Sequence, residues 1–104
     1  MAAPNGGPVW GTATDDLNAT ILEWPSGAGP AEHVNDERDV VVVVTAGTLR
    51  VAVDGVEREA VAGEVVVLPK GATRRLTAGA DGVRYVSVHR KRSGLSIATL
   101  SRPR

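Results

Sequence analysis

The sequence predicts an all-β protein, and three observations lead to this prediction. Several segments alternate apolar and polar residues with a period of two, as strands with one buried face do. The apolar residues are mostly Val, Leu, Ile and Ala, with no Phe and only 3% aromatic residues, and a valine-rich core favours sheet over helix. Turn signals recur about every ten residues, and no segment has a convincing helical periodicity. Seven or eight short strands of this kind are typical of a sandwich or barrel.

The first strands are predicted from alternation and from β-branched residues. Leu17–Trp24 alternates apolar and polar residues and stops before Pro25, after which Ser26–Pro30 is predicted to be a turn. Asp39–Thr45 contains five consecutive valines and is too short for a typical helix. We therefore expect it to be a strand with two buried faces.

The middle of the chain contains the clearest hairpin. Thr48–Val53 and Val56–Val61 flank Asp54-Gly55, a dipeptide that favours a two-residue hairpin turn. Gly63–Leu68 is the next predicted strand, because it is apolar and ends at a proline.

The last predicted strands are shorter or less regular. Thr73–Thr77 is a short strand, residues 78–82 are predicted to form a loop, and Val83–His89 alternates again. Leu95–Leu100 is a candidate edge strand.

Length and composition limit the organisation of the chain. With 104 residues it is long enough for one domain, which we place at residues 9–100, after a flexible arm at 1–8 and before a basic end at 101–104. There is no cysteine, so disulfides and thiolate metal sites are excluded. The start of the chain has neither a basic segment nor an apolar run, and no segment has the length of a membrane span. We therefore expect a cytoplasmic protein without a membrane partner.

The charge distribution argues against nucleic acid as a partner. The net charge is zero, and five of the twelve basic residues lie in the last fifteen positions. This basic tail has no interleaved aromatic residues, and the rest of the chain is acidic. A solvated tail explains the pattern.

Two frameworks of glycine and proline carry a resemblance to a known family. The first is Gly27, five residues, His33-Val34-Asn35 and then Gly47; the second is Gly63, five residues, Pro69-Lys70-Gly71, two residues and Arg74. Together they resemble the two motifs of the cupins, over roughly Leu17–His89. The resemblance implies a double-stranded β-helix, or jelly-roll barrel, with a ligand site inside the barrel mouth. It also implies that the chain forms a homodimer, as small cupins often do.

The metal ligands of the cupin motifs are mostly replaced in this chain. By the resemblance, His33 stands in the first histidine position, Asn35 in the second, Val40 in the glutamate position and Arg74 in the third histidine position. Valine offers no donor atom, and arginine brings a permanent positive charge to the place of a cation. We therefore expect no metal and no other cofactor. A shift of register would offer Asp39 in place of Val40, but Asp39 should face away from the barrel.

The candidate ligand contacts are His33, Asn35 and Arg74. His33 can carry a proton near neutral pH, although a surface histidine in a polar loop is the alternative. Asn35 shares a strand face with His33, or it forms a turn. Arg74 suits a carboxylate or phosphate, but a salt bridge to Glu64 or another acidic residue would also explain it.

Further candidates line the two strands expected at the lumen. Val40 and Val42 would supply apolar contacts. Tyr85 and His89 either enter the lumen together with Ser87, or form a solvent-exposed face while the valines between them pack inward. The alternation favours the second arrangement, and Tyr85 is kept as a candidate ligand contact.

The five valines also bear on assembly. Val41 and Val43 cannot point into the same lumen as Val40, Val42 and Val44, yet both sets are apolar. A second subunit, or its N-terminal arm, would cover the outer set. We therefore expect a homodimer.

These residues support several functions. The first is a metal-free cupin that binds a small polar or anionic organic ligand in the barrel, with Arg74 as the anion anchor. The second is an isomerase, cyclase or lyase in which His33 is the general acid or base and Arg74 stabilises negative charge. The third is a metal-dependent oxygenase using His33 and Asn35 with His89 or Asp39, and the fourth is a structural or assembly role.

Overall fold

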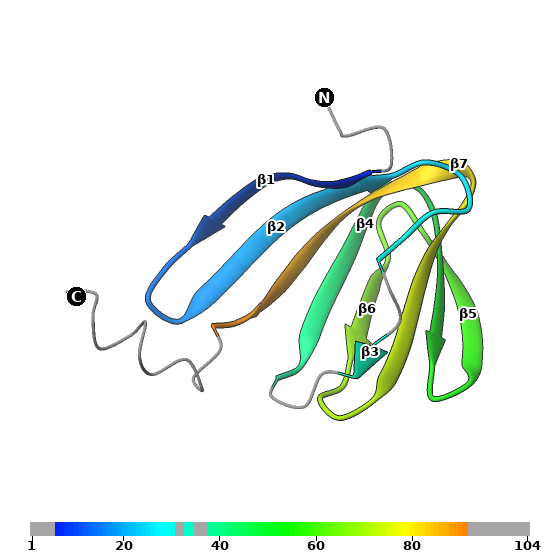
Figure 1. Cartoon of the computed structure of the whole chain (residues 1–104). Coiled ribbons are helices and arrows are strands. Elements are labelled where there is room, and N and C mark those ends of the chain that lie inside the picture. Colours follow the sequence, from blue (N-terminus) through cyan, green and yellow to red (C-terminus); the bar gives the residue numbers. More distant parts are fainter. Residues whose placement is uncertain (1–5, 31–32, 35–37, 92–104) are drawn as a thin grey trace.

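A computed structural model describes residues 6–30, 33–34 and 38–91, and within these ranges the chain is all-β (Figure 1). Seven strands form one antiparallel sheet that is folded over on itself. The strands are β1 (Gly7–Ala13), β2 (Leu17–Trp24), β3 (His33–Val34), β4 (Val40–Val53), β5 (Val56–Val61), β6 (Val65–Leu68) and β7 (Thr73–Arg90). The described ranges contain no helix that is long and apolar enough to cross a membrane.

The two longest strands, β4 and β7, each belong to both walls of the barrel. The order of the main sheet is β1-β2-β7-β4-β5, with β3 added to β7 and β6 added to β4. The first wall consists of β1, β2, β6, the beginning of β4 and the end of β7. The second wall consists of β3, β5, the end of β4 and the beginning of β7. Figure 1 shows β1 and β2 extending beyond the part of the barrel that β5 closes.

Gly47 and Gly82 lie where β4 and β7 turn from one wall into the other. Both have positive φ, +75° and +77°, which residues with a side chain rarely adopt. A Cβ atom on Gly47 would collide with the carbonyl oxygen of Gly82. The pairing of β4 with β7 also shifts register between Val44 and Ala46 and between Gly47 and Leu49. This corner therefore requires glycine for both conformation and space.

The corner changes which residues face inward. In β4 the buried residues are even-numbered before the corner, from Val40 to Val44, and odd-numbered after it, at Leu49 and Val51. In β7 they are even-numbered from Arg74 to Ala78 and odd-numbered at Val83 and Tyr85. The core lies between the two walls and contains Val40, Val42, Val44, Leu49, Val51, Ala60, Val66, Leu68, Leu76, Ala78, Val83 and Tyr85.

Several predicted elements are confirmed. β2 and β5 have the predicted bounds, and β6 begins two residues later than predicted. The predicted hairpin turn has positive φ at both residues, 49° at Asp54 and 85° at Gly55. Such a turn matches the twist of the strands on either side of it.

Other predictions are wrong in ways that the corner explains. The predicted loop at 78–82 is part of β7, and the two strands predicted at Asp39–Thr45 and Thr48–Val53 are one strand, β4. Small residues at these places bend a strand without ending it.

β1 and β3 were not predicted, and Gly7 and Pro8 of the expected arm begin β1. Residues 1–5, the strand expected at Leu95–Leu100 and the basic end at 101–104 lie outside the described residues.

The five valines do alternate between the two faces. Val40, Val42 and Val44 are at most 3% exposed, whereas Val41 is 36% exposed. The expectation that this strand has two buried faces therefore does not hold within a single chain.

Candidate functional site

Arg74 projects into the barrel from the second wall. It lies in β7 between His33 of β3 and Val53 of β4 in the strand register, and it is only 8% exposed. Arg75, the next residue, is exposed on the other face, as expected for neighbours in a strand. Burial lowers the pKa of Arg74, the positive charge of Arg38 lowers it further, and Tyr85 partly opposes both effects. Arg74 and Arg38 therefore both bring positive charge to this part of the barrel.

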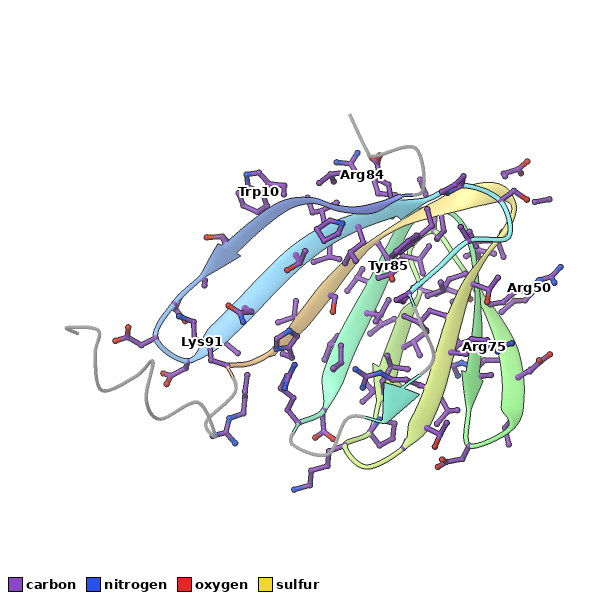
Figure 2. The ribbon with its side chains drawn as sticks, viewed as in Figure 1. Trp10, Arg50, Arg75, Arg84, Tyr85 and Lys91 are labelled. Carbon is purple, nitrogen blue, oxygen red and sulfur yellow. The ribbon has the colours of Figure 1, made fainter. Side chains whose placement is uncertain are left out.

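Tyr85 enters the barrel from the first wall, at 1% exposure, and lies opposite the buried Val44. The prediction that Tyr85 belongs to a solvent-exposed face is therefore wrong. Figure 2 shows Tyr85 among the interior side chains, whereas Trp10 and Arg84 lie on the outer side of the first wall. The Tyr85 hydroxyl accepts a hydrogen bond of 3.1 Å from Nε1 of Trp24. Burial raises the pKa of Tyr85, and the Trp24 hydrogen bond and the charge of Arg74 oppose this increase.

Polar residues line the inner face of the first wall beside Tyr85. Strands β2 and β7 pair Leu22 with Tyr85, and the two next inward-facing pairs are polar. These are Thr20 with Ser87 and Asn18 with His89, and all four side chains are half-buried. The inner face therefore changes from apolar at Leu22 to polar at the end of the barrel that these pairs line.

Arg38 contacts this polar end. Its Nε lies 3.0 Å from Nδ1 of His89, and the same Nδ1 lies 2.8 Å from the carbonyl oxygen of Arg90. The lone pair of a neutral Nδ1 can accept from Arg38, whereas a protonated Nδ1 can donate to Arg90, so the two bonds are alternatives. We assign the Arg38 bond to the neutral ring with its proton on Nε2.

The remaining candidates differ in how far the structure describes them. Val40 and Val42 are buried core residues of the first wall, at 3% and 1% exposure. The backbone of His33 pairs with that of Arg74, and its side chain lies outside the described part of the structure. Asn35 also lies outside the described residues. Glu64, the alternative partner of Arg74, is exposed, and its carboxylate accepts a 2.8 Å hydrogen bond from the Val61 N–H.

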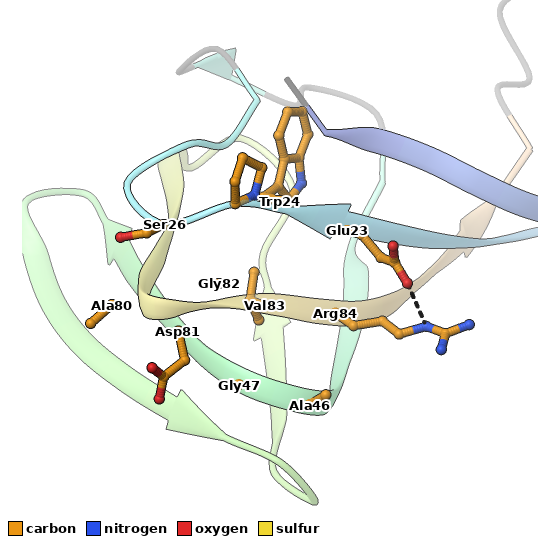
Figure 3. A pocket seen from close by; sticks show the side chains of 11 residues that line it. Glu23, Trp24, Ser26, Ala46, Gly47, Ala80, Asp81, Gly82, Val83 and Arg84 are labelled. Atoms are coloured by element: carbon orange, nitrogen blue, oxygen red, sulfur yellow. Dashed lines mark ion pairs between the residues drawn. The ribbon is translucent and has the colours of Figure 1, made fainter. Parts of the chain in front are cut away.

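A cavity of about 690 Å³ lies at the corner, and neither Arg74 nor Tyr85 lines it (Figure 3). Its lining includes Trp24, Gly47, Asp81 and an exposed ion pair, in which Arg84 Nε and Glu23 Oε2 are 3.3 Å apart. Because Asp81 adds a second carboxylate to this ion pair, the lining carries more negative than positive charge and does not favour an anion. A smaller cavity of about 270 Å³ is lined by Arg38 and His89 at the polar end of the barrel.

Comparison with known proteins identifies the family. The sequence model described as "Cupin domain" matches residues 20–89, more than half of the chain. The chain belongs to the cupin family. Its jelly-roll fold, predicted from the sequence motifs, is likewise confirmed by solved structures. A comparison with curated proteins gave no match.

The solved structures show the cupin fold alone, because their sequence identity to this chain is low. KdgF from Halomonas sp. superposes with a TM-score of 0.78 at 21% identity, covering 91% of this chain and 87% of KdgF. An RmlC-like cupin from Shewanella frigidimarina gives a TM-score of 0.69 at 21% identity, covering 78% and 71%. The Clostridium difficile EutQ protein gives 0.66 at 22% identity, covering 81% and 61%.

The side chains of this cupin do not fit the metal that many cupins hold. Val40, which the motif resemblance puts in the glutamate position, is packed in the core, and Arg74, which it puts in the third histidine position, is buried. Asp39 is exposed, and its carboxylate accepts a 2.9 Å hydrogen bond from the Lys70 N–H. Among the described residues, no three His, Asp or Glu side chains are close enough together to hold a metal ion. His89 is next to a guanidinium, whose charge opposes a cation there.

The structure adds two side-chain contacts to the barrel interior that were not predicted from the sequence. Trp24 bonds to Tyr85, and Arg38 bonds to His89. Trp24 lies on the same face of β2 as Asn18, Thr20 and Leu22, so the alternation of β2 could have placed it inside. Its partner Tyr85 is 61 residues away, and no local pattern indicates such a pairing. Arg38 was not among the predicted site residues, because its contact with His89, 51 residues away, depends on the fold.

We predict that this cupin does not bind a metal ion tightly. After incubation with iron, nickel, manganese or zinc and then desalting, plasma mass spectrometry should detect far less than one ion per chain. Tight binding needs about three or four metal-ligand atoms from the protein. Arg74 and Val40 supply none at the two positions where the resemblance places a histidine and a glutamate ligand. A nearly stoichiometric content of any of these metals would contradict the prediction.

We predict an alkaline titration of Tyr85 above the ordinary tyrosine pKa of about 10. Tyr85 is the single tyrosine of the chain, so the near-ultraviolet absorbance of tyrosinate reports on it alone. The unfolded protein in denaturant is the control. Both states are protonated below about pH 10, and above it the unfolded chain loses the proton first. Stability should therefore fall as the pH rises through this window, by about 1.4 kcal/mol for each unit of pKa difference. A midpoint at or below that of the unfolded chain would contradict the prediction.

Proposed function

We propose that this cupin binds a small polar or anionic organic ligand in the barrel without a metal ion, and that Arg74 anchors it. The observation that carries the proposal is a guanidinium at 8% exposure inside the barrel, at the position of a family metal ligand. A fixed positive charge there favours an anion in the place where the family holds a cation.

The charges around Arg74 support an anionic ligand. Arg38 is close enough to lower the pKa of Arg74, so two guanidiniums contribute to the potential of the interior. Guanidinium groups present parallel N–H donors that match the two oxygens of a carboxylate. The polar pairs at the end of the first wall would give such a ligand a hydrated approach to the barrel.

The other contacts complete the proposed site. Tyr85 faces the same interior as Arg74, and Val40 and Val42 would provide apolar contacts if the ligand displaces part of the local packing. His33 and Asn35 stay predictions as polar contacts. A cytoplasmic location and the absence of nucleic-acid and membrane partners also stay predictions.

Acid–base catalysis in the same place is the second candidate. It is favoured by one observation, a phenol at 1% exposure that faces the same interior as the buried guanidinium of Arg74. The phenol could donate a proton to a substrate whose negative charge Arg74 stabilises. An isomerase, cyclase or lyase would also need a base, and the predicted base is His33.

Ligand binding should depend on Arg74 and not on its neighbour. We expect small carboxylates to raise the Tm of the wild-type protein. At a ligand concentration of a hundred times Kd, binding should add about 2.7 kcal/mol to the free energy of unfolding. Arg74→Ala should abolish this stabilisation, because the fixed cation is lost.

Arg75→Ala is the matched control, because Arg75 is exposed on the opposite face of the same strand. Arg74→Met, which keeps the length but not the charge, tests whether loss of packing explains the result. The assignment of Arg74 to the site would be wrong if carboxylates stabilised Arg74→Ala as much as the wild type.

We also propose that this cupin is a homodimer that covers an outer apolar face. We define this face by the outward residues Trp10, Ala19, Ile21, Val41, Val43, Val65, Val67, Val86 and Val88, which run across all five strands of the first wall. Trp10, Val65 and Val67 are 60%, 54% and 56% exposed.

Two properties of the outer apolar face favour a second copy of the chain as its partner. The face contains no charged residue, and next to it lies the exposed Glu23–Arg84 pair, which has no net charge. An isologous dimer places the same surface on both sides, and an uncharged apolar surface is complementary to itself. A strongly charged partner would find no complementary charge on this face.

Val67→Glu should convert the dimer to a monomer. A carboxylate buried in an apolar interface costs several kcal/mol, which is a loss of about 100-fold or more in dimer affinity. Light scattering coupled to size exclusion measures the mass directly. Val56→Glu is the matched control, because Val56 is 71% exposed on β5 and lies outside the outer apolar face. A wild-type monomer, or a Val67→Glu dimer, would contradict the proposal.

A further inference from the structure

The Tyr85 hydroxyl lies among groups that donate hydrogen bonds. Trp24 Nε1 donates to the hydroxyl oxygen at 3.1 Å, and Arg74 is close enough to influence the pKa of the phenol. Tyr85 is 1% exposed and Arg74 is 8% exposed, so bulk water has little access to either. The two residues come from opposite walls of the barrel and face the same interior.

The chemistry of these three side chains determines what can join them. Indole N–H and guanidinium groups only donate, and the phenol oxygen already accepts from Trp24, so the phenol proton is available for donation. In the part of the chain that the structure describes, the bond from Trp24 is the hydrogen bond that the Tyr85 side chain makes. A group that binds between Tyr85 and Arg74 must therefore be a hydrogen-bond acceptor, and the positive charge of Arg74 favours an anion.

The protonation state of Tyr85 is consistent with this role. Its raised pKa means that the phenol keeps its proton at neutral pH and remains a donor. The bond from Trp24 also restricts the rotation of the phenol O–H, because the proton must point away from the indole.

We propose that Tyr85 and Arg74 together bind a carboxylate, with Trp24 as the positioning residue that directs the Tyr85 proton to a carboxylate oxygen. This inference rests on the proposed function and specifies its ligand class as a small carboxylic acid with a short apolar chain. Val42, Val44 and Leu49 belong to the same buried cluster as Tyr85, so an apolar chain beside Tyr85 would contact apolar side chains and displace part of their packing. A phosphate or phosphonate has a third oxygen that would need further donors in this apolar setting.

The experiment compares three probes with the same short chain: butyrate, butyramide and propylphosphonate. The chain has two tryptophans, and Trp10→Phe removes the exposed one, so that fluorescence reports on Trp24 alone. In this background we expect butyrate to bind at least about 10-fold more tightly than butyramide and more tightly than propylphosphonate, because the amide has lost the charge that Arg74 pairs with.

Variants separate this inference from the proposed function. Tyr85→Phe should weaken butyrate about 10-fold or more and reduce its preference over butyramide. Trp24→Phe should weaken butyrate by a smaller factor and raise the pKa of Tyr85, because the indole bond that lowers it is lost. Because Trp24→Phe removes the fluorophore, its affinity and that of Tyr85→Phe are measured by calorimetry, with near-ultraviolet circular dichroism as the check of the fold.

A second measurement requires no substitution in the site. Saturating butyrate should raise the alkaline titration midpoint of Tyr85 in the wild-type protein, because a neighbouring carboxylate disfavours tyrosinate. A structural role alone would leave this midpoint unchanged.

The outcomes that overturn the inference are distinct. If Arg74→Ala abolishes butyrate binding, but Tyr85→Phe keeps both the affinity and the preference over butyramide, the role of Tyr85 is wrong while the proposed function stands. An unchanged Tyr85 midpoint at saturating butyrate has the same meaning. Tighter binding of propylphosphonate overturns the carboxylate class. Binding of none of the probes to the wild type overturns the inference, while the set of small carboxylates compared between the wild type and Arg74→Ala still tests the proposed function.

Discussion

The corner in β4 and β7 is the constraint on which the rest of the structure depends. Arg74 and Tyr85 are eleven residues apart in a single strand, and a straight strand would hold them about 36 Å apart on opposite faces. The bend at Gly82, packed against Gly47, folds β7 over and changes which of its residues point inward. A guanidinium from one wall and a phenol from the other thereby share one interior. The enclosed core and the candidate site both follow from this geometry.

The chemistry of that interior differs from that of a metal-holding cupin in the sign of its charge. Metal ligands are acceptors that surround a cation, whereas Arg74, Tyr85 and Trp24 can together supply donors for an anion. The same barrel can support either arrangement, because the backbone framework of glycines and turns is independent of the residues that point into the lumen. This separation between framework and site explains why the motifs indicate the family although, by the resemblance, three of the four metal-ligand positions hold other residues.

The sequence predicted the parts of the fold that depend on local patterns. The bounds of β2 and β5 were predicted correctly from the alternation and turn signals around them. The Asp54-Gly55 turn was predicted from a dipeptide that favours positive φ. The orientation of Tyr85 was predicted wrongly, because Val86 and Val88 are also apolar and the alternation favoured them as the inward residues, whereas they lie on the outer apolar face. The corner was interpreted as a loop because small residues are typical both of loops and of bends within a strand. Arg74, which was chosen by its motif position, is buried in the barrel and its role stays a prediction, whereas the contacts of Trp24 and Arg38 depend on residues far away in the sequence.

The position of β7 has a consequence for how the protein is made. β7 pairs with β2, β3 and β4, and it is the last strand that the described residues contain. On the ribosome, these three earlier strands must wait with unpaired edges until the segment through Arg90 has left the exit tunnel. The nascent chain therefore passes through a stage in which its valine-rich strands are exposed to other nascent chains. Chaperone demand should be concentrated in the short interval between the emergence of β2 and the closure of the barrel by β7.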